Sequence, residues 1–203
     1  ETVNVGTVNN DPAAGSNGCY FDVSGVVGDV PAGGGYLRSS LPAHCHYLGH
    51  EPCGAFAPHQ DTSAGFRALL PLPWQDGALD VVISLAGIHN VADKAALFRE
   101  MHRVTRPGGR LVISDVAEGS AVAGFLDGFV GQHNSTGHEG AYLNGETVAS
   151  LLQTGWLVVS DEIRQIPWHF SSEADLATFG AGRARCFPGL LVDADRNPKN
   201  PHA

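Results

Sequence analysis

The chain has 203 residues, of which 43% are hydrophobic and 16% are charged, a balance typical of one globular domain rather than of a disordered chain. Its net charge of −9 argues against a nucleic-acid partner, because such partners require a basic face. No apolar run approaches the ~20 residues of a membrane span, and the first residues show no signal-peptide pattern. Four cysteines do not make a disulfide framework in a chain of this length, so a reducing cytoplasm is the predicted location.

The first third of the chain gives mostly short signals. Residues 1–19 are rich in Asn, Gly and Ala without periodicity, which predicts a flexible arm. An apolar stretch predicts a strand over 23–30, and a short helix is expected over 36–41, before Pro42. Further strands are expected at "HYLG" (46–49) and, weakly, at "FRALLPLP" (66–73).

The pattern becomes clearer from residue 79. "LDVVISL" (79–85) is a continuous apolar run, as in a strand buried on both faces. Residues 93–104 predict a helix that starts at Asp93 and places four apolar residues on one face: Leu97, Phe98, Met101 and Val104. "RPGG" (106–109) is expected to end this helix and turn the chain into another buried strand over 110–116.

The last third contains further helices and strands. Helices are predicted over 119–130, 146–155 and 171–179, and residues 131–145 form a long polar loop between the first two. "WLVVSDEIRQIPWHF" (156–170) predicts two strands with a short connection, hence an antiparallel pair. Residues 193–203 predict a disordered tail, which leaves a single folded domain over 20–192.

The alternation of strands and helices predicts an α/β fold with a mostly parallel sheet. In such sheets, ligands bind beyond the carboxyl ends of the strands. Gly33, Gly34 and Gly35 follow the first strand, where a glycine turn lets backbone N–H groups approach a ligand closely. Glu51 follows the second strand, where a carboxylate can accept hydrogen bonds from both hydroxyls of a ribose. Together they indicate a nucleoside cofactor; the alternative for the glycines alone is a plain tight turn between strand and helix.

Three segments resemble the class I S-adenosylmethionine-dependent methyltransferases. They are "DVPAGGG" (29–35), "LPWQDGALD" (72–80) and "HRVTRPGGRLVISD" (102–115), which match the family's motifs in order and spacing. The resemblance covers roughly residues 24–170. It implies a Rossmann-like sheet of seven strands in the order 3-2-1-4-5-7-6, with strand 7 antiparallel and helices on both faces.

The resemblance also implies S-adenosylmethionine as the cofactor and a set of residues around it. Asp29 would support the glycine loop and the methionine amino group, Gly33 and Gly35 would flank the cofactor, and Glu51 would bind the ribose. Leu85 and Ala86, at the start of the segment 85–87, would line the cleft near the methyl group. One departure concerns the adenine: the family usually has an acidic residue just before its "LP" stretch, whereas "FRALLP" has none.

Two histidines are candidates for a catalytic base or a substrate contact. His89 follows the strand at 79–85, at the cleft side of the sheet, and His138 lies in the long loop 131–145, a place where substrate lids occur. Each could instead have a capping or surface hydrogen-bonding role. The segment 44–59 holds four His and two Cys, but without the spacing of a zinc finger, so no metal is expected.

The leading functional hypothesis is methyl transfer to a small molecule, with neither nucleic acid nor a membrane as partner and with a homodimer as one option for assembly. An alternative of another class is a methyltransferase-fold protein that binds a ligand or partner without catalysis. A nicotinamide-dependent oxidoreductase is disfavoured by the "RPGG" and "LPWQDGALD" segments.

Overall fold

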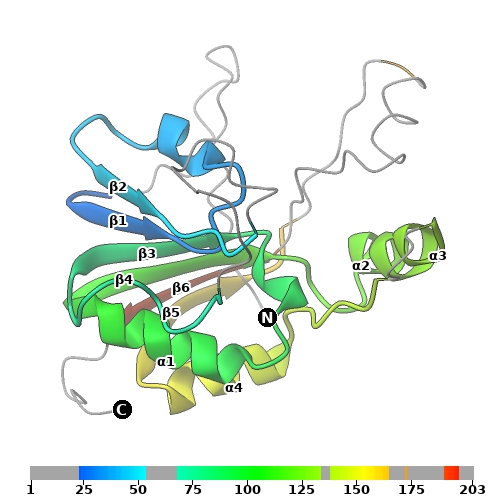
Figure 1. Cartoon of the computed structure of the whole chain (residues 1–203). Helices are drawn as coiled ribbons and strands as arrows, with labels where there is room; N and C mark the ends of the chain where they lie inside the picture. The colour runs from blue at the N-terminus through cyan, green and yellow to red at the C-terminus, as the bar shows by residue number, and fades with distance from the viewer. Residues whose placement is uncertain (1–22, 54–67, 134–137, 165–171, 173–189, 197–203) are drawn as a thin grey trace.

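The structure is a computed structural model that describes residues 23–53, 68–133, 138–164, 172 and 190–196. Within these residues, six strands form one sheet in the order β2-β1-β3-β4-β6-β5 (Figure 1). The strands are β1 (Val26–Asp29), β2 (His46–Gly49), β3 (Leu79–Leu85), β4 (Thr105–Asp115), β5 (Trp156–Glu162) and β6 (Leu190–Arg196). Strands β1 to β4 are parallel, whereas β6 is antiparallel to both β4 and β5. The predicted mostly parallel α/β sheet is confirmed.

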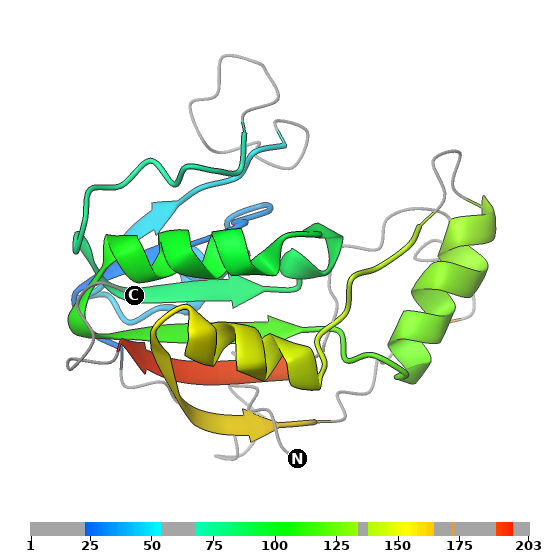
Figure 2. The same cartoon turned by 90° about the horizontal axis from the view of Figure 1, so that it is seen from below.

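Helices connect the strands along the chain. They are η1 (a 3-10 helix, Tyr36–Ser40), η3 (3-10, Ile88–Asn90), α1 (Lys94–Val104), α2 (Ala121–Phe125), η4 (a π-helix, Leu126–Val130), α3 (Gly131–His133) and α4 (Gly145–Gln153). Helices α1 and α4 lie side by side on one face of the sheet (Figures 1 and 2). The predicted apolar face of α1 is confirmed, because all four of its residues are fully buried.

Local capping signals set the start of α1 and α4. The Asp93 carboxylate accepts a hydrogen bond from the backbone N–H of Ala96, and thereby pairs one of the N–H groups that a helix start leaves without a partner. Asn144 and Thr147 form a reciprocal capping box at the start of α4. Across the layers, the indole N–H of Trp156 on β5 donates to the Phe98 carbonyl on α1 at 3.1 Å.

The "RPGG" segment interrupts the pairing of β3 with β4. Thr105 pairs with Leu79 and Arg110 pairs with Val81, so residues 106–109 form an excursion within the strand, with Gly108 at φ 75°. The Asp80 carboxylate holds this region together, since it accepts hydrogen bonds from the backbone N–H of Val26 and from the Arg106 guanidinium. These bonds lower the pKa of Asp80, and the bond from Val26 has the largest effect.

A helical arm extends from the body of the molecule. Segments α2, η4 and α3 follow one another from Ala121 to His133 and lie beyond the carboxyl ends of β3 and β4 (Figure 2). The helix predicted over 119–130 is confirmed in type, but it contains a π-helical turn and continues into the residues that we predicted to start a loop. A π-turn widens the helix by one residue per turn and is frequent at functional sites.

Two sequence predictions are corrected by the structure. Because β6 spans Leu190–Arg196, residues 193–196 of the predicted tail are in a strand instead of being disordered. Of the weak strand predicted before Pro71, the described residues 68–70 form no strand. Strand β5 pairs with β6, far along the chain, and most of the second strand predicted within 156–170 lies outside the described residues, which end at 164 in this part of the chain.

The expected seven-strand order is not confirmed. The observed order equals the expected one with strand 3 removed. Each of the six described strands therefore lies beside the strands that the expected order places next to it, strand 3 apart. The N-terminal arm (1–19), residues 197–203 and the helix predicted over 171–179, except Ser172, lie outside the described residues.

Candidate functional site

A cavity of about 470 Å³ opens at the carboxyl ends of β1, β2 and β3. Its size is within the range of small-molecule and cofactor sites. Most of the residues that line it come from three places: the end of β1 with the loop and η1 that follow, the segment after β2, and the end of β3 with the segment that follows; Leu69 adds a fourth. This is the position that the parallel sheet predicts for a ligand.

The glycine loop forms one wall of the cavity. The backbone N–H of Gly33 donates to Glu51 Oε2 at 2.7 Å, and the N–H of Cys53 donates to Glu51 Oε1 at 2.8 Å. Glu51 is buried and lines the cavity, so its carboxylate links the loop to the end of β2. Each carboxylate oxygen accepts up to two hydrogen bonds, which leaves acceptor capacity for ligand hydroxyls.

The loop glycines have different roles. Gly33 has φ 52°, and a Cβ built on it would meet no atom within 4 Å, so the space beside its backbone is open on the cavity side. Gly34 also lines the cavity. Gly35, predicted as a cofactor contact, is not among the lining residues. It has φ 71° and precedes η1, and its N–H donates to the Ala32 carbonyl at 2.8 Å.

Asp29 lies at the floor of the cavity, at the last position of β1. It is 3% exposed, and it accepts a hydrogen bond from the Tyr47 hydroxyl at 2.9 Å. Burial raises the pKa of Asp29 to about 7; the negative charge of Glu51 acts in the same direction and the bond from Tyr47 opposes it. The carboxyl group can therefore gain or lose its proton near neutral pH.

The segment after β3 forms the opposite wall. Leu85, Ala86 and Gly87 line the cavity, as the sequence predicts. Ala86 has φ 49°, a left-handed conformation that is uncommon for a residue with a Cβ, and its N–H donates to the Ser114 carbonyl at 2.7 Å. Such strained positions cluster at functional sites.

His89, in η3, lies on the same wall and is 3% exposed. Its Nδ1 is 2.7 Å from Oδ1 of Asp115, which is fully buried at the carboxyl end of β4. Asp115 is the last residue of the motif 102–115, but the sequence analysis assigned no function to it. The available signal was its place at the end of a buried strand next to the strand that precedes His89.

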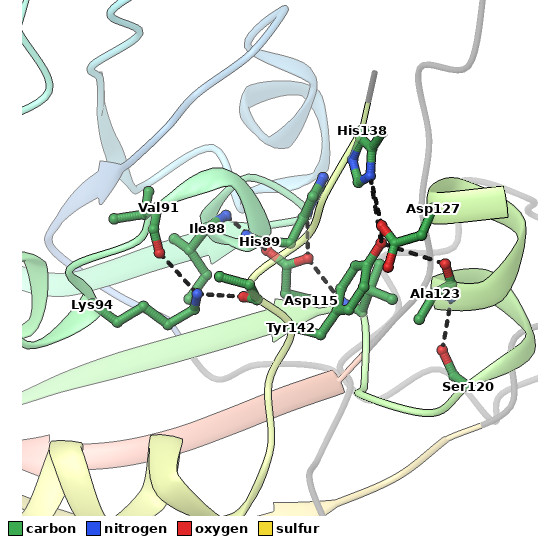
Figure 3. Close-up of polar contacts among 12 residues, drawn as sticks. Ile88, His89, Val91, Lys94, Asp115, Ser120, Ala123, Asp127, His138 and Tyr142 are labelled. Carbon is green, nitrogen blue, oxygen red and sulfur yellow. Dashed lines mark hydrogen bonds and ion pairs between the residues drawn. The ribbon is translucent and has the colours of Figure 1, made fainter. Parts of the chain in front are cut away.

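His138 lies beside His89, but it is not among the residues that line the cavity. The two ring centroids are 5.8 Å apart, and the Tyr142 ring is 6.4 Å from each. Asp127 of η4 accepts hydrogen bonds from His138 Nδ1 at 3.0 Å and from the Tyr142 hydroxyl at 2.6 Å (Figure 3). Burial acts to raise the pKa of Asp127, but these bonds and one from the Gly140 N–H lower it overall.

Pro52, Cys53 and Leu69 provide the apolar part of the cavity wall near Glu51. The carboxylates that line the cavity are Asp29 and Glu51, so the described wall carries no third acidic group. The missing adenine-side carboxylate noted in the sequence thus has no substitute among these lining residues.

Three histidine and cysteine side chains of segment 44–53 contact backbone carbonyls. His44 and Cys45 contact the Val23 carbonyl, and His50 contacts the Leu69 carbonyl at 3.1 Å. Across the described residues, no three His, Cys, Asp or Glu side chains come together as a metal site requires. In the same part of the chain, no helix has the length and apolar character needed to cross a membrane.

Comparison with known proteins gives matches to a family model, to curated proteins and to solved structures. The family model described as a methyltransferase domain matches residues 29–113. An uncharacterized protein of Escherichia coli, YafE, is 33% identical over 126 residues, which are 62% of this chain and 57% of that protein. A demethylmenaquinone methyltransferase of Mycolicibacterium vanbaalenii is 54% identical over 44 residues, 22% of this chain and 19% of that protein.

Among solved structures, an S-adenosylmethionine-dependent methyltransferase from Mesorhizobium loti superposes with a TM-score of 0.55 at 19% identity. The superposition covers 87% of this chain and 94% of that one, and it shows a shared fold. The matches to the two curated relatives span less than two thirds of their length. The chain thus matches a methyltransferase domain over residues 29–113, which include the cavity wall from Asp29 to Glu51, and it has the fold of the superposed S-adenosylmethionine-dependent methyltransferase.

Proposed function

We propose that this protein transfers the methyl group of S-adenosylmethionine to a small molecule. The observation that carries the proposal is the pairing of Glu51 with the glycine loop on one wall of the cavity. A carboxylate at the tip of the second strand, beside a backbone that leaves open space, suits a ribose whose hydroxyls need acceptors.

The residues present fit this cofactor. Glu51 would hold the ribose hydroxyls, Gly33 would let the cofactor approach the backbone, and Asp29 would face the methionine amino group. Pro52, Cys53 and Leu69 offer an apolar surface for the adenine ring of the cofactor. When bound, S-adenosylmethionine supplies an electrophilic methyl group on a positively charged sulfur.

The acceptor would lie between the segment 85–89 and the His138–Tyr142 pair. Leu85 and Ala86 form the wall that would exclude water from the reacting atoms, while His89 and His138 provide two imidazoles within 5.8 Å of each other. Either imidazole is a candidate to take the proton of the acceptor atom. The dimension of the cavity and the acceptor named for the matched demethylmenaquinone methyltransferase support a small-molecule acceptor.

A cytoplasmic location, a homodimer and the lack of a nucleic-acid partner stay predictions. The acidic net charge supports the last of them.

Calorimetry tests the cofactor class first. S-adenosylhomocysteine, the product form, should bind the purified protein, whereas NADH should give no heat of binding. Release of S-adenosylhomocysteine from S-adenosylmethionine with demethylmenaquinone as a first trial acceptor then tests turnover. Binding of NADH without binding of S-adenosylhomocysteine would overturn the proposal.

A further inference from the structure

Asp115 is surrounded by hydrogen-bond donors. Its Oδ2 accepts from the backbone N–H groups of Ile88 at 2.7 Å and His89 at 3.0 Å. Its Oδ1 accepts from the Val116 N–H at 2.7 Å and faces Nδ1 of His89 at 2.7 Å. All of these contacts are buried, and the side chain of Asp115 is 0% exposed (Figure 3).

These contacts dictate which atoms carry protons. A carboxylate has about four lone-pair sites and no donor, and here three backbone N–H groups and Nδ1 of His89 contact its two oxygens. Because three of the donors are backbone N–H groups, which cannot reverse their role, the side chain acts as an acceptor throughout. The fourth contact is then also a donor to Asp115, so His89 carries its proton on Nδ1 and its lone pair on Nε2.

His89 is placed where a base would be needed. It lies in η3 directly after the strained segment at Ala86 and lines the cavity together with Asn90. In Figure 3 the ring stands over the Asp115 carboxylate, and Tyr142 lies beside this pair, next to Asp127. A buried negative charge at Nδ1 would also stabilise the imidazolium that forms when Nε2 takes a proton.

We infer that Asp115 is a positioning residue that fixes the tautomer and orientation of His89, so that Nε2 of His89 takes the proton lost by the methyl acceptor. The inference rests on the proposed methyl transfer. In that step a lone pair of the acceptor's oxygen or nitrogen forms the bond to the methyl carbon. The carbon–sulfur bond breaks, with its electron pair going to sulfur, and the proton of the acceptor atom moves to Nε2.

The pair His138–Asp127 is a matched comparison within the same molecule. Its Nδ1 to Oδ1 distance is 3.0 Å, but the Asp127 side chain is 45% exposed, against 0% for Asp115. Water can therefore replace a lost contact at Asp127, whereas nothing replaces one at Asp115. The two carboxylates allow the same substitution to be made in a buried and in an exposed imidazole–carboxylate pair.

Long-range ¹H–¹⁵N correlation spectra of the histidine side chains test the inference without an acceptor. In the wild-type protein, His89 should show the Nδ1–H tautomer. In Asp115→Asn the side-chain amide has one donor end. If this end replaces Oδ2 it opposes two backbone N–H groups, but if it replaces Oδ1 it opposes only that of Val116. The second orientation points the amide donor at His89, and the tautomer should invert to Nε2–H.

Such an inversion removes the base, and the corresponding change in a Ser-His-Asp triad lowers kcat about 10⁴-fold for this reason. Asp127→Asn is the control and should leave the tautomer of His89 unchanged. An Nε2–H tautomer in the wild-type protein would overturn the inference even if Asp115→Asn fails to fold. Retention of Nδ1–H in Asp115→Asn, or a change at His89 in Asp127→Asn, would do the same.

Calorimetry with S-adenosylhomocysteine on these samples separates this inference from the proposed function. Failure of the wild-type protein to bind S-adenosylhomocysteine would refute methyl transfer, and with it the role of His89 as a base, whatever the tautomer. Binding by the wild type and by Asp115→Asn with equal affinity, together with tautomer inversion, is the result that we expect.

Discussion

At the scale of single residues, the carboxyl groups of Asp29 and Glu51 have different roles in the cavity. Both are buried and line it, but their partners differ. Glu51 receives two backbone N–H groups, whereas Asp29 receives one hydroxyl and has its pKa raised to about 7. One carboxyl group therefore organises the loop, and the other is sensitive to pH.

We expect Glu51→Ala to weaken S-adenosylhomocysteine binding by ~10- to 100-fold, because hydrogen bonds to a charged group contribute roughly 1.5–3 kcal/mol. Glu51→Gln should bind no more tightly than Glu51→Ala, since its NH₂ end would oppose the N–H of either Gly33 or Cys53. Calorimetric titration of the three proteins measures this. Equal affinities for all three would show that Glu51 does not contact the cofactor.

The pKa of Asp29 predicts two opposite pH dependences. If ionised Asp29 holds the ammonium group of the cofactor, affinity for S-adenosylhomocysteine should rise roughly 5- to 10-fold between pH 6 and pH 8, as the carboxyl group ionises. Without ligand, the folded state binds more protons than the unfolded state between the ordinary pKa of 3.8 and about 7. The free energy of unfolding should therefore fall as pH rises through this window.

Asp29→Asn removes the titrating group and should flatten both curves. Calorimetry at pH 6, 7 and 8 and urea unfolding at pH 5 to 8 provide the two measurements. A wild-type unfolding free energy that rises over this window would contradict the prediction.

At the scale of elements, the loop between β1 and η1 connects the sheet to the cavity. The first half of its backbone is fixed, because the N–H of Val30 donates to the Ile83 carbonyl at 3.0 Å and the N–H of Ala32 donates to the His50 carbonyl at 3.0 Å. The positive φ of Gly33 and Gly35 allows the chain to turn between these anchors and η1. Glycine is therefore needed at these positions for its backbone conformation and not for flexibility.

Gly33→Val should abolish S-adenosylhomocysteine binding, because the new side chain would enter the open space beside the loop. The matched control is Gly119→Val: Gly119 has φ 71°, also meets no atom within 4 Å of a built Cβ, and does not line the cavity. Both variants should lose about 1–3 kcal/mol of stability from strain at positive φ. Only Gly33→Val should lose binding, and comparable affinity in both variants would place the cofactor elsewhere.

At the scale of the whole molecule, α1 and the sheet bury one shared core. Phe98 of α1 is fully buried, and its carbonyl accepts the indole N–H of Trp156 from the far edge of the sheet. His102 of the same helix packs edge-to-face on Trp156 at 5.3 Å. The helix thus joins β5 to the strands that position the site.

Phe98→Ala should lower the free energy of unfolding by about 3–5 kcal/mol, the usual cost of a lost aromatic side chain and the cavity it leaves. Leu152→Ala on α4 is the control: this side chain is 53% exposed, and its loss should change stability by less than about 0.5 kcal/mol. Urea unfolding of the two variants decides the matter. A small effect of Phe98→Ala would mean that α1 is not part of the core.

The sequence by itself determined the elements whose signals are local. The strand 79–85 was predicted to the residue, and the helix from Asp93 to Val104 was predicted with its cap and buried face, because periodicity and capping depend on neighbours in the chain. Gly33, Glu51 and His89 were predicted near a ligand from their position at strand ends, and Asp29, Leu85 and Ala86 from the family resemblance. All six line the cavity, whereas Gly35 and His138 are not among its lining residues.

Only the tertiary structure decided which distant residues meet. It paired β5 with β6, brought His138 next to His89, and put Asp115 under His89 across 26 residues of chain. The pattern of apolar residues within one segment carries no information about which distant residues will meet. They form because burying a polar group is unfavourable unless a partner completes its hydrogen bonds, and the fold alone selects which partner lies within reach.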